Sequence, residues 1–103
     1  MGSIRVLLVV ASLLFVACGP GIEEDATGQD IYLQICARCH ADNLSGGLGP
    51  ALVGEDSPTP DRPQTYILQT IRSGLGRMPA FGGTLSDDQI QRVTDYIISQ
   101  QDV

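Results

Sequence analysis

Residues 36–40 read Cys36-Ala-Arg-Cys39-His40, and this stretch decides how the chain folds. On a helix, positions i, i+3 and i+4 lie on one side, so both thiols and the imidazole face the same way. The spacing is the attachment signature of a c-type haem, with the imidazole as an axial iron ligand. The motif therefore predicts one covalent haem c, bound through Cys36 and Cys39 and ligated by His40.

Three other uses of this motif fit the chain less well. A structural zinc site needs four nitrogen or sulfur ligands, and beyond the motif only Cys18, in the N-terminal signal, is available. A thioredoxin-like redox pair belongs to a βαβ setting, and no such pattern is visible. A simple disulfide would leave the adjacent single histidine unexplained. Covalent haem is the interpretation that uses all three side chains.

The inventory of possible iron ligands is short. His40 is the only histidine, Met78 is the only methionine besides Met1, and lysine is absent from the sequence. A single methionine in a loop is usually a gap-filler. Here Pro79 restrains the backbone beside Met78, and neighbouring glycines allow the loop to wrap a flat group. We therefore expect Met78 to be the second axial ligand.

The first 17 residues have the pattern of an export signal. Arg5 supplies a positive charge, and residues 6–16 form an apolar segment that is too short to span a bilayer, which takes about 20 residues. Residues 14–18 resemble the lipobox of bacterial lipoproteins, although Phe15 stands where that family usually has leucine. We expect removal of residues 1–17 and lipidation of Cys18, with ordinary cleavage or an uncleaved anchor as the alternatives.

The charge balance limits the partners. The formal net charge of the whole chain is −6, and all twelve acidic residues but only five of the six arginines follow Cys18. Such a surface excludes general nucleic-acid binding. It favours steering towards positively charged partner surfaces, or it serves solubility alone. Residues 19–26, GPGIEEDA, are predicted to be a short, flexible, acidic tether with a reach of at most about 29 Å.

The remaining residues, 27–103, are predicted to form one small all-α domain. The expected helices run from 28 to about 38, from near 63 to 74, and from 86 towards the end. The last has the clearest start, because Ser86 and Gln89 form a capping box. A domain of this size buries little apolar surface and usually needs a further source of stability, such as a disulfide, a metal or a bound cofactor. Covalent haem would supply that stability.

Over residues 27–99 the chain resembles the class I cytochrome c family. The motifs that carry the resemblance are Gly28 and Tyr32, the haem motif, Gly49-Pro50-Ala51-Leu52, Gly76-Arg77-Met78-Pro79-Ala80-Phe81, and Leu85-Ser86 with Tyr96. The resemblance implies a small cytochrome c fold, with three main helices and loops wrapped around one covalent haem. It also implies a close crossing of the first and last helices at Gly28, with Tyr32 and Tyr96 at the junction.

The same resemblance assigns roles around the haem. His40 would be the proximal ligand and Met78 the distal ligand. The carbonyl of Pro50 would accept a hydrogen bond from the ring nitrogen of His40 that does not bind iron. Leu52 and Phe81 would pack on the haem, as side chains that are otherwise ordinary core residues.

These inferences predict a single-electron carrier rather than an enzyme, because a methionine sulfur would fill the sixth iron position. The alternative is a small haem enzyme or gas-binding sensor with an open sixth position. The predicted location is the periplasm or the outer face of the cytoplasmic membrane, with a lipid anchor. Expected partners are membrane-associated redox proteins: a quinol-oxidising complex, a terminal oxidase or a dehydrogenase.

Overall fold

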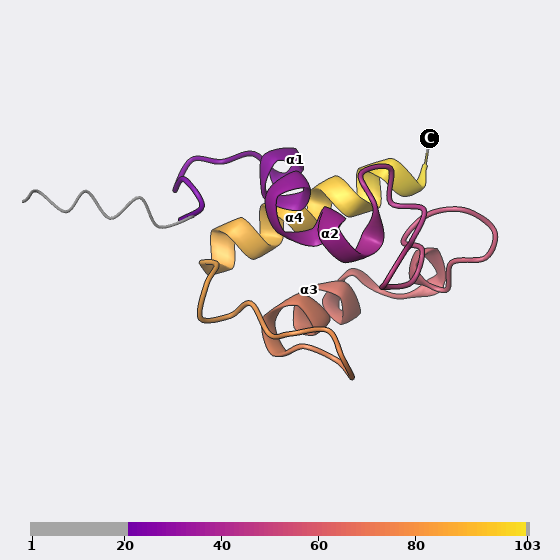
Figure 1. Cartoon of the computed structure of the whole chain (residues 1–103). Coiled ribbons are helices and arrows are strands. Elements are labelled where there is room, and N and C mark those ends of the chain that lie inside the picture. The colour runs from indigo at the N-terminus through magenta and orange to yellow at the C-terminus, as the bar shows by residue number, and fades with distance from the viewer. Residues whose placement is uncertain (1–20, 103) are drawn as a thin grey trace, which may run out of the picture.

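The computed structural model describes residues 21–102, and its fold is helical, as predicted. Its α-helices are α1 (Gly28–Ile31), α2 (Ala37–His40), α3 (Gln64–Ser73) and α4 (Asp87–Gln101), with a short 3₁₀ turn at Thr59–Asp61. Figure 1 shows α1 lying across α4, with α3 along the other side of the molecule. No helix within residues 21–102 combines the length and apolarity needed to cross a membrane. The predicted signal sequence and Cys18 lie outside the described residues.

A π-helical turn joins α1 to α2, so residues 28–40 form one continuous helical segment. The segment starts at Thr27, whose hydroxyl accepts a hydrogen bond from the backbone of Asp30 at 3.1 Å. It ends two residues later than predicted, because the amide of Ala41 still donates to the carbonyl of Ala37 at 2.9 Å. The observed helical segment therefore contains the whole haem motif.

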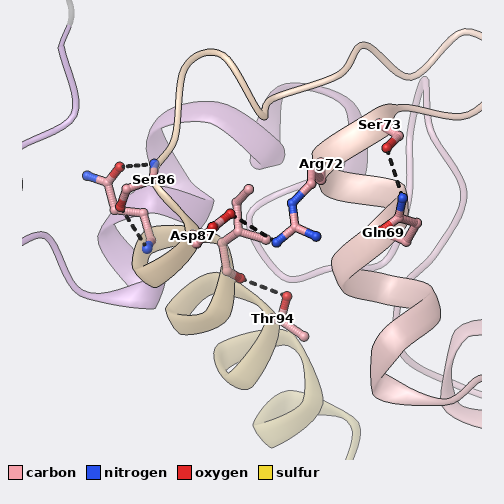
Figure 2. Close-up of polar contacts among 8 residues, drawn as sticks. Gln69, Arg72, Ser73, Ser86, Asp87 and Thr94 are labelled. Atoms are coloured by element: carbon pink, nitrogen blue, oxygen red, sulfur yellow. Dashed lines mark hydrogen bonds and ion pairs between the residues drawn. The ribbon is translucent and has the colours of Figure 1, made fainter.

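The other two predicted helices are confirmed with their boundaries nearly unchanged. α3 follows Pro63 and stops at Gly74, whose φ of 75° is a left-handed conformation that favours glycine. α4 starts with the predicted capping box: the Ser86 amide donates to Gln89 Oε1 at 2.8 Å, and the Gln89 amide donates to Ser86 Oγ at 3.2 Å (Figure 2). An ion pair of 3.0 Å between Arg72 and Asp87 links α3 to this start.

The first and last helices cross closely, as the family resemblance implied. A Cβ at Gly28 would overlap with the carbonyl oxygen of Arg92 and lie 2.9 Å from the Cβ of Tyr96. The rings of Tyr32 and Tyr96 meet at the crossing, with centroids 5.5 Å apart. The largest fully buried side chains gather on the crossing helical segments and are Tyr32, Ile31, Ile90, Val93 and Thr94. This crossing is the centre of the protein core.

The segment predicted to be a free tether is partly held against α4. Gln89 Nε2 donates to the carbonyl of Glu23 at 3.2 Å. The guanidinium of Arg92 donates to the carbonyl of Glu24 at 2.8 Å and to that of Ala26, which is buried. In this structure, residues 23–26 therefore contact α4 through hydrogen bonds.

Replacing Arg92 with methionine is expected to release this segment, because methionine keeps an apolar stem but donates no hydrogen bond. Hydrogen bonds from a charged group contribute about 1.5–3 kcal/mol, so we expect a loss of about 2 kcal/mol in the free energy of unfolding. The amide of Ala26, which donates to Glu23 at 3.0 Å, should also exchange faster with solvent. Arg62→Met, at an exposed arginine over the ring of Tyr66, is the control. Unchanged exchange at Ala26 would show that Arg92 does not hold the segment.

Candidate haem site

The three side chains of the haem motif lie together at the end of the first helical segment. Cys36 is the last residue of the π-helical turn, and Cys39 and His40 lie in α2. Cys36 and His40 are buried, whereas Cys39 is exposed. The two thiols are not joined in a disulfide. Both sulfurs are therefore available for thioether bonds.

The ring of His40 is held by the loop that follows it. Its Nδ1 lies 2.7 Å from the carbonyl oxygen of Pro50, an acceptor, so Nδ1 carries the proton and donates. The lone pair of Nε2 is then left to bind a metal. Gly49 approaches the ring so closely that a Cβ there would lie 2.9 Å from the Cε1 atom of His40. The structure thus contains the hydrogen bond that the resemblance implied between His40 and Pro50.

Backbone hydrogen bonds fold this loop back onto α2. The amide of Gly49 donates to the carbonyl of Cys39 at 2.7 Å, and that of Gly46 donates to the carbonyl of His40 at 2.9 Å. A buried serine, Ser57, donates from its hydroxyl to the carbonyl of Ala51 at 2.7 Å. We had not identified Ser57 from the sequence, because a serine in a proline-rich loop carries no signal of burial.

Met78 lies in a tight turn that backbone hydrogen bonds hold next to the end of α3. The backbones of Leu75 and Met78 exchange two hydrogen bonds, of 3.1 and 2.9 Å. A Cβ at Gly74 would lie 2.7 Å from the Met78 carbonyl oxygen, so only glycine fits there. Further along, the amide of Phe81 donates to the carbonyl of Ile71 at 2.9 Å. The Met78 side chain is half-buried and packs against the core.

Two pKa values near the motif are raised. Burial, with a smaller contribution from Cys39, raises the pKa of the free Cys36 thiol to about 12. The pKa of Tyr32 is also raised, first by burial and then by Cys36 and Tyr96. The phenol of Tyr32 therefore stays protonated and donates a hydrogen bond to the carbonyl of Ala41 at 2.6 Å.

The residues present fit a covalent haem. Two unpaired thiols and an imidazole with a free Nε2 are the donors that the group requires. Leu52, Met78 and Phe81 pack on the core while remaining partly exposed, and an apolar ring could cover that exposed area. Within residues 21–102, no group of three or more His, Cys, Asp or Glu side chains could hold a metal ion directly.

Comparison with known proteins decides the family. A family model described as "Cytochrome C oxidase, cbb3-type, subunit III" matches residues 23–97. This chain is a class I c-type cytochrome. Haem c is therefore attached covalently through Cys36 and Cys39.

Two curated relatives and one solved structure show how far the similarity reaches. The cytochrome is 32% identical to the 4-cresol dehydrogenase [hydroxylating] cytochrome c subunit of Pseudomonas putida, over 84% of this chain and 73% of the relative. It is 35% identical to cytochrome c6 of Leptolyngbya boryana, over 73% of this chain and 91% of the relative. A solved structure described as "c-type cytochrome NirC" matches with a TM-score of 0.57 and 32% identity, over 70% of this chain and 85% of the other. The predicted small cytochrome c fold is confirmed.

Proposed function

We propose that this cytochrome is a single-electron carrier in which His40 and Met78 are the axial ligands. The observation that carries the proposal is the 2.7 Å contact between His40 Nδ1 and Pro50, which leaves Nε2 for iron. The bound haem supplies an iron that gains or loses one electron. The hydrogen bond to Pro50 would hold the His40 ring in a fixed orientation. The hydrogen-bonded turn at Met78 would supply a neutral sulfur ligand, which stabilises the reduced state.

The chain's own residues favour electron transfer over catalysis. A haem enzyme or gas sensor needs an open iron position, usually with a distal acid–base residue. The sequence has no second histidine for that role. Met78, held by the reciprocal bonds with Leu75, would exclude water and small ligands from the iron. No observation on the described residues therefore favours a haem enzyme or a gas-binding sensor over an electron carrier.

The visible absorption spectrum of the haem-loaded protein tests this proposal. We expect a low-spin spectrum in both redox states, with the ferric charge-transfer band of a methionine–iron bond. Carbon monoxide added to the reduced protein should leave the spectrum unchanged, because the sixth position is filled. A high-spin spectrum, or ready binding of carbon monoxide, would contradict the proposal and would support a haem enzyme or gas-binding sensor instead.

We further propose that the protein is exported and anchored through a lipid on Cys18, at the outer face of the cytoplasmic membrane or in the periplasm. The bonds from Gln89 and Arg92 to residues 23–26 shorten the free part of the tether. The chain from Cys18 to Glu23 can then span at most about 18 Å. Such a short connection limits electron exchange to partners close to the membrane.

The candidate partners are a quinol-oxidising complex, a terminal oxidase or a dehydrogenase. Similarity to a protein named as the cytochrome c subunit of 4-cresol dehydrogenase supports the dehydrogenase class. The acidic character of the chain favours a positively charged docking surface on the partner. Electron-transfer rates with a partner of this kind should fall as the salt concentration rises.

Replacing Cys18 with serine is expected to abolish lipidation of the cytochrome, because position 18 would have no thiol to acylate. After fractionation of expressing cells, wild-type protein should stay with the membranes, and the Cys18→Ser variant should either be soluble or keep its signal. Mass spectrometry of the wild-type N-terminus should show an acylated cysteine. The neighbouring Ser12→Ala variant is the control and should fractionate like wild type. A non-acylated wild-type N-terminus would refute the lipid anchor.

A further inference from the structure

We propose that the hydroxyl of Tyr32 is a positioning group for the His40 imidazole, acting through the backbone of Ala41. The inference rests on the proposed role of His40 as an iron ligand. Tyr32 Oη donates to the carbonyl oxygen of Ala41 at 2.6 Å, and the tyrosine side chain is fully buried. The contact joins residues nine positions apart, on either side of the haem motif.

The backbone of Ala41 has a conformation that alanine adopts only under constraint. Its φ is 67° and its ψ is 157°, a region populated almost only by glycine. Such a conformation persists where surrounding contacts hold it. Here the amide of Ala41 donates to Ala37 at 2.9 Å, while its carbonyl accepts from Leu44 at 3.1 Å and from Tyr32. Among residues 21–102, Tyr32 is the only side chain found to bond to Ala41.

This conformation reverses the chain directly after the haem motif. Because of the reversal, the amide of Gly46 reaches the His40 carbonyl and that of Gly49 reaches the Cys39 carbonyl. The same return brings the Pro50 carbonyl to His40 Nδ1 and the Gly49 backbone onto the ring. The geometry at the reversal therefore determines where the acceptor for the imidazole lies.

Tyr32 is itself held on both sides. Its carbonyl accepts from the amide of Ala37, the first residue of α2, and this bond closes the π-helical turn. Its ring packs on that of Tyr96, with centroids 5.5 Å apart. The wider turn thus helps to set how Tyr32 is rotated relative to the haem motif, and α4 supports the ring from the other side. The tyrosine whose hydroxyl bonds to Ala41 is therefore held in place at both its backbone and its ring.

The consequence concerns the electron density on the axial ligand. A hydrogen bond from Nδ1 to a carbonyl fixes the ring and increases the basicity of Nε2. Loss of the Tyr32 hydroxyl should loosen the reversal at Ala41 and lengthen the bond from His40 to Pro50. A less basic imidazole stabilises ferric iron less, so the reduction potential should rise.

The test compares Tyr32→Phe with Tyr96→Phe in the haem-loaded protein. Both variants remove one hydroxyl from the same ring pair, but only that of Tyr32 bonds to Ala41. For Tyr32→Phe we expect the His40 Nδ1 proton to exchange with solvent roughly fivefold faster by NMR, the effect of losing one typical hydrogen bond. We also expect a higher reduction potential. Tyr96→Phe should leave both quantities at their wild-type values.

Substitution of Ala41 by glycine separates positioning from simple packing. Glycine adopts the required φ without strain, so the hydroxyl should matter less in an Ala41→Gly background. We expect the double variant, Tyr32→Phe with Ala41→Gly, to match Ala41→Gly alone in proton exchange and potential. This comparison also decides the case in which Tyr32→Phe alone does not fold.

Three results would overturn the proposal: unchanged exchange and potential in Tyr32→Phe, equal shifts in both phenylalanine variants, or an undiminished effect in the glycine background. Failure of the proposed His40 and Met78 ligation would instead appear in the spectrum of the wild-type protein. The two failures are therefore distinguishable.

Discussion

Replacing Met78 with leucine is expected to convert the low-spin cytochrome into a high-spin one that binds carbon monoxide. Leucine nearly matches the volume and apolarity of methionine, so the change in side-chain packing should cost less than about 1.5 kcal/mol. It has no lone pair, so the sixth iron position would be vacant or filled by water. The ferric charge-transfer band should disappear. The reduction potential should fall by on the order of 0.2 V, within the ~0.8 V range that axial ligands cover.

Two further variants make this result specific to the sulfur. Phe81→Leu changes a half-buried side chain in the same loop but leaves Met78 in place, so its charge-transfer band should persist. Met78→His should restore a low-spin spectrum at a lower potential than wild type, because imidazole is a harder ligand. If Met78→Leu kept the wild-type band, the assignment of Met78 as a ligand would be wrong.

Replacing Gly28 with alanine is expected to destabilise the protein by about 3 kcal/mol, at the upper end of the usual cost of overpacking. Alanine is ordinarily the better helix residue by about 1 kcal/mol. Here the added Cβ would overlap with the backbone carbonyl of Arg92 and approach Tyr96, and a backbone atom cannot rotate away. We therefore expect the clash to outweigh the gain in helix propensity, because α1 and α4 must separate.

Chemical denaturation of the haem-loaded protein would measure the loss, with Gly83→Ala as the matched control. A Cβ at Gly83 meets nothing within 4 Å, and its φ is not left-handed. That variant should therefore stay within about 0.5 kcal/mol of wild type. Equal stability of the two variants would show that the helix crossing tolerates a side chain at Gly28.

The parts of the fold that could be predicted from the sequence are those decided by neighbouring residues. The start of α4 follows from Ser86 and Gln89, three positions apart, and the end of α3 follows from Gly74. Helix capping and glycine conformations depend on a few consecutive residues. These boundaries were therefore visible without any tertiary information.

The contacts that were missed join residues far apart in the chain. Residues 23–26 have the composition of a free tether, but Gln89 and Arg92, more than sixty positions away, hold them. Two local features were also missed, the burial of Ser57 and the π-helical turn before Ala37, because neither follows a recognisable residue pattern. Polar side chains that bond to distant carbonyls carry no periodicity, so sequence analysis assigns them to the surface.

The sequence by itself determined the chemistry of this protein. The spacing of Cys36, Cys39 and His40 specifies covalent haem, because attachment depends on reactive groups one helical turn apart. The tertiary structure alone decided how those groups are held: the close approach of Gly49 to the ring, the reversal at Ala41 and the hydroxyl that supports it. Reactive groups are properties of residue type and local spacing, whereas their orientation depends on backbone groups that only the folded chain brings together.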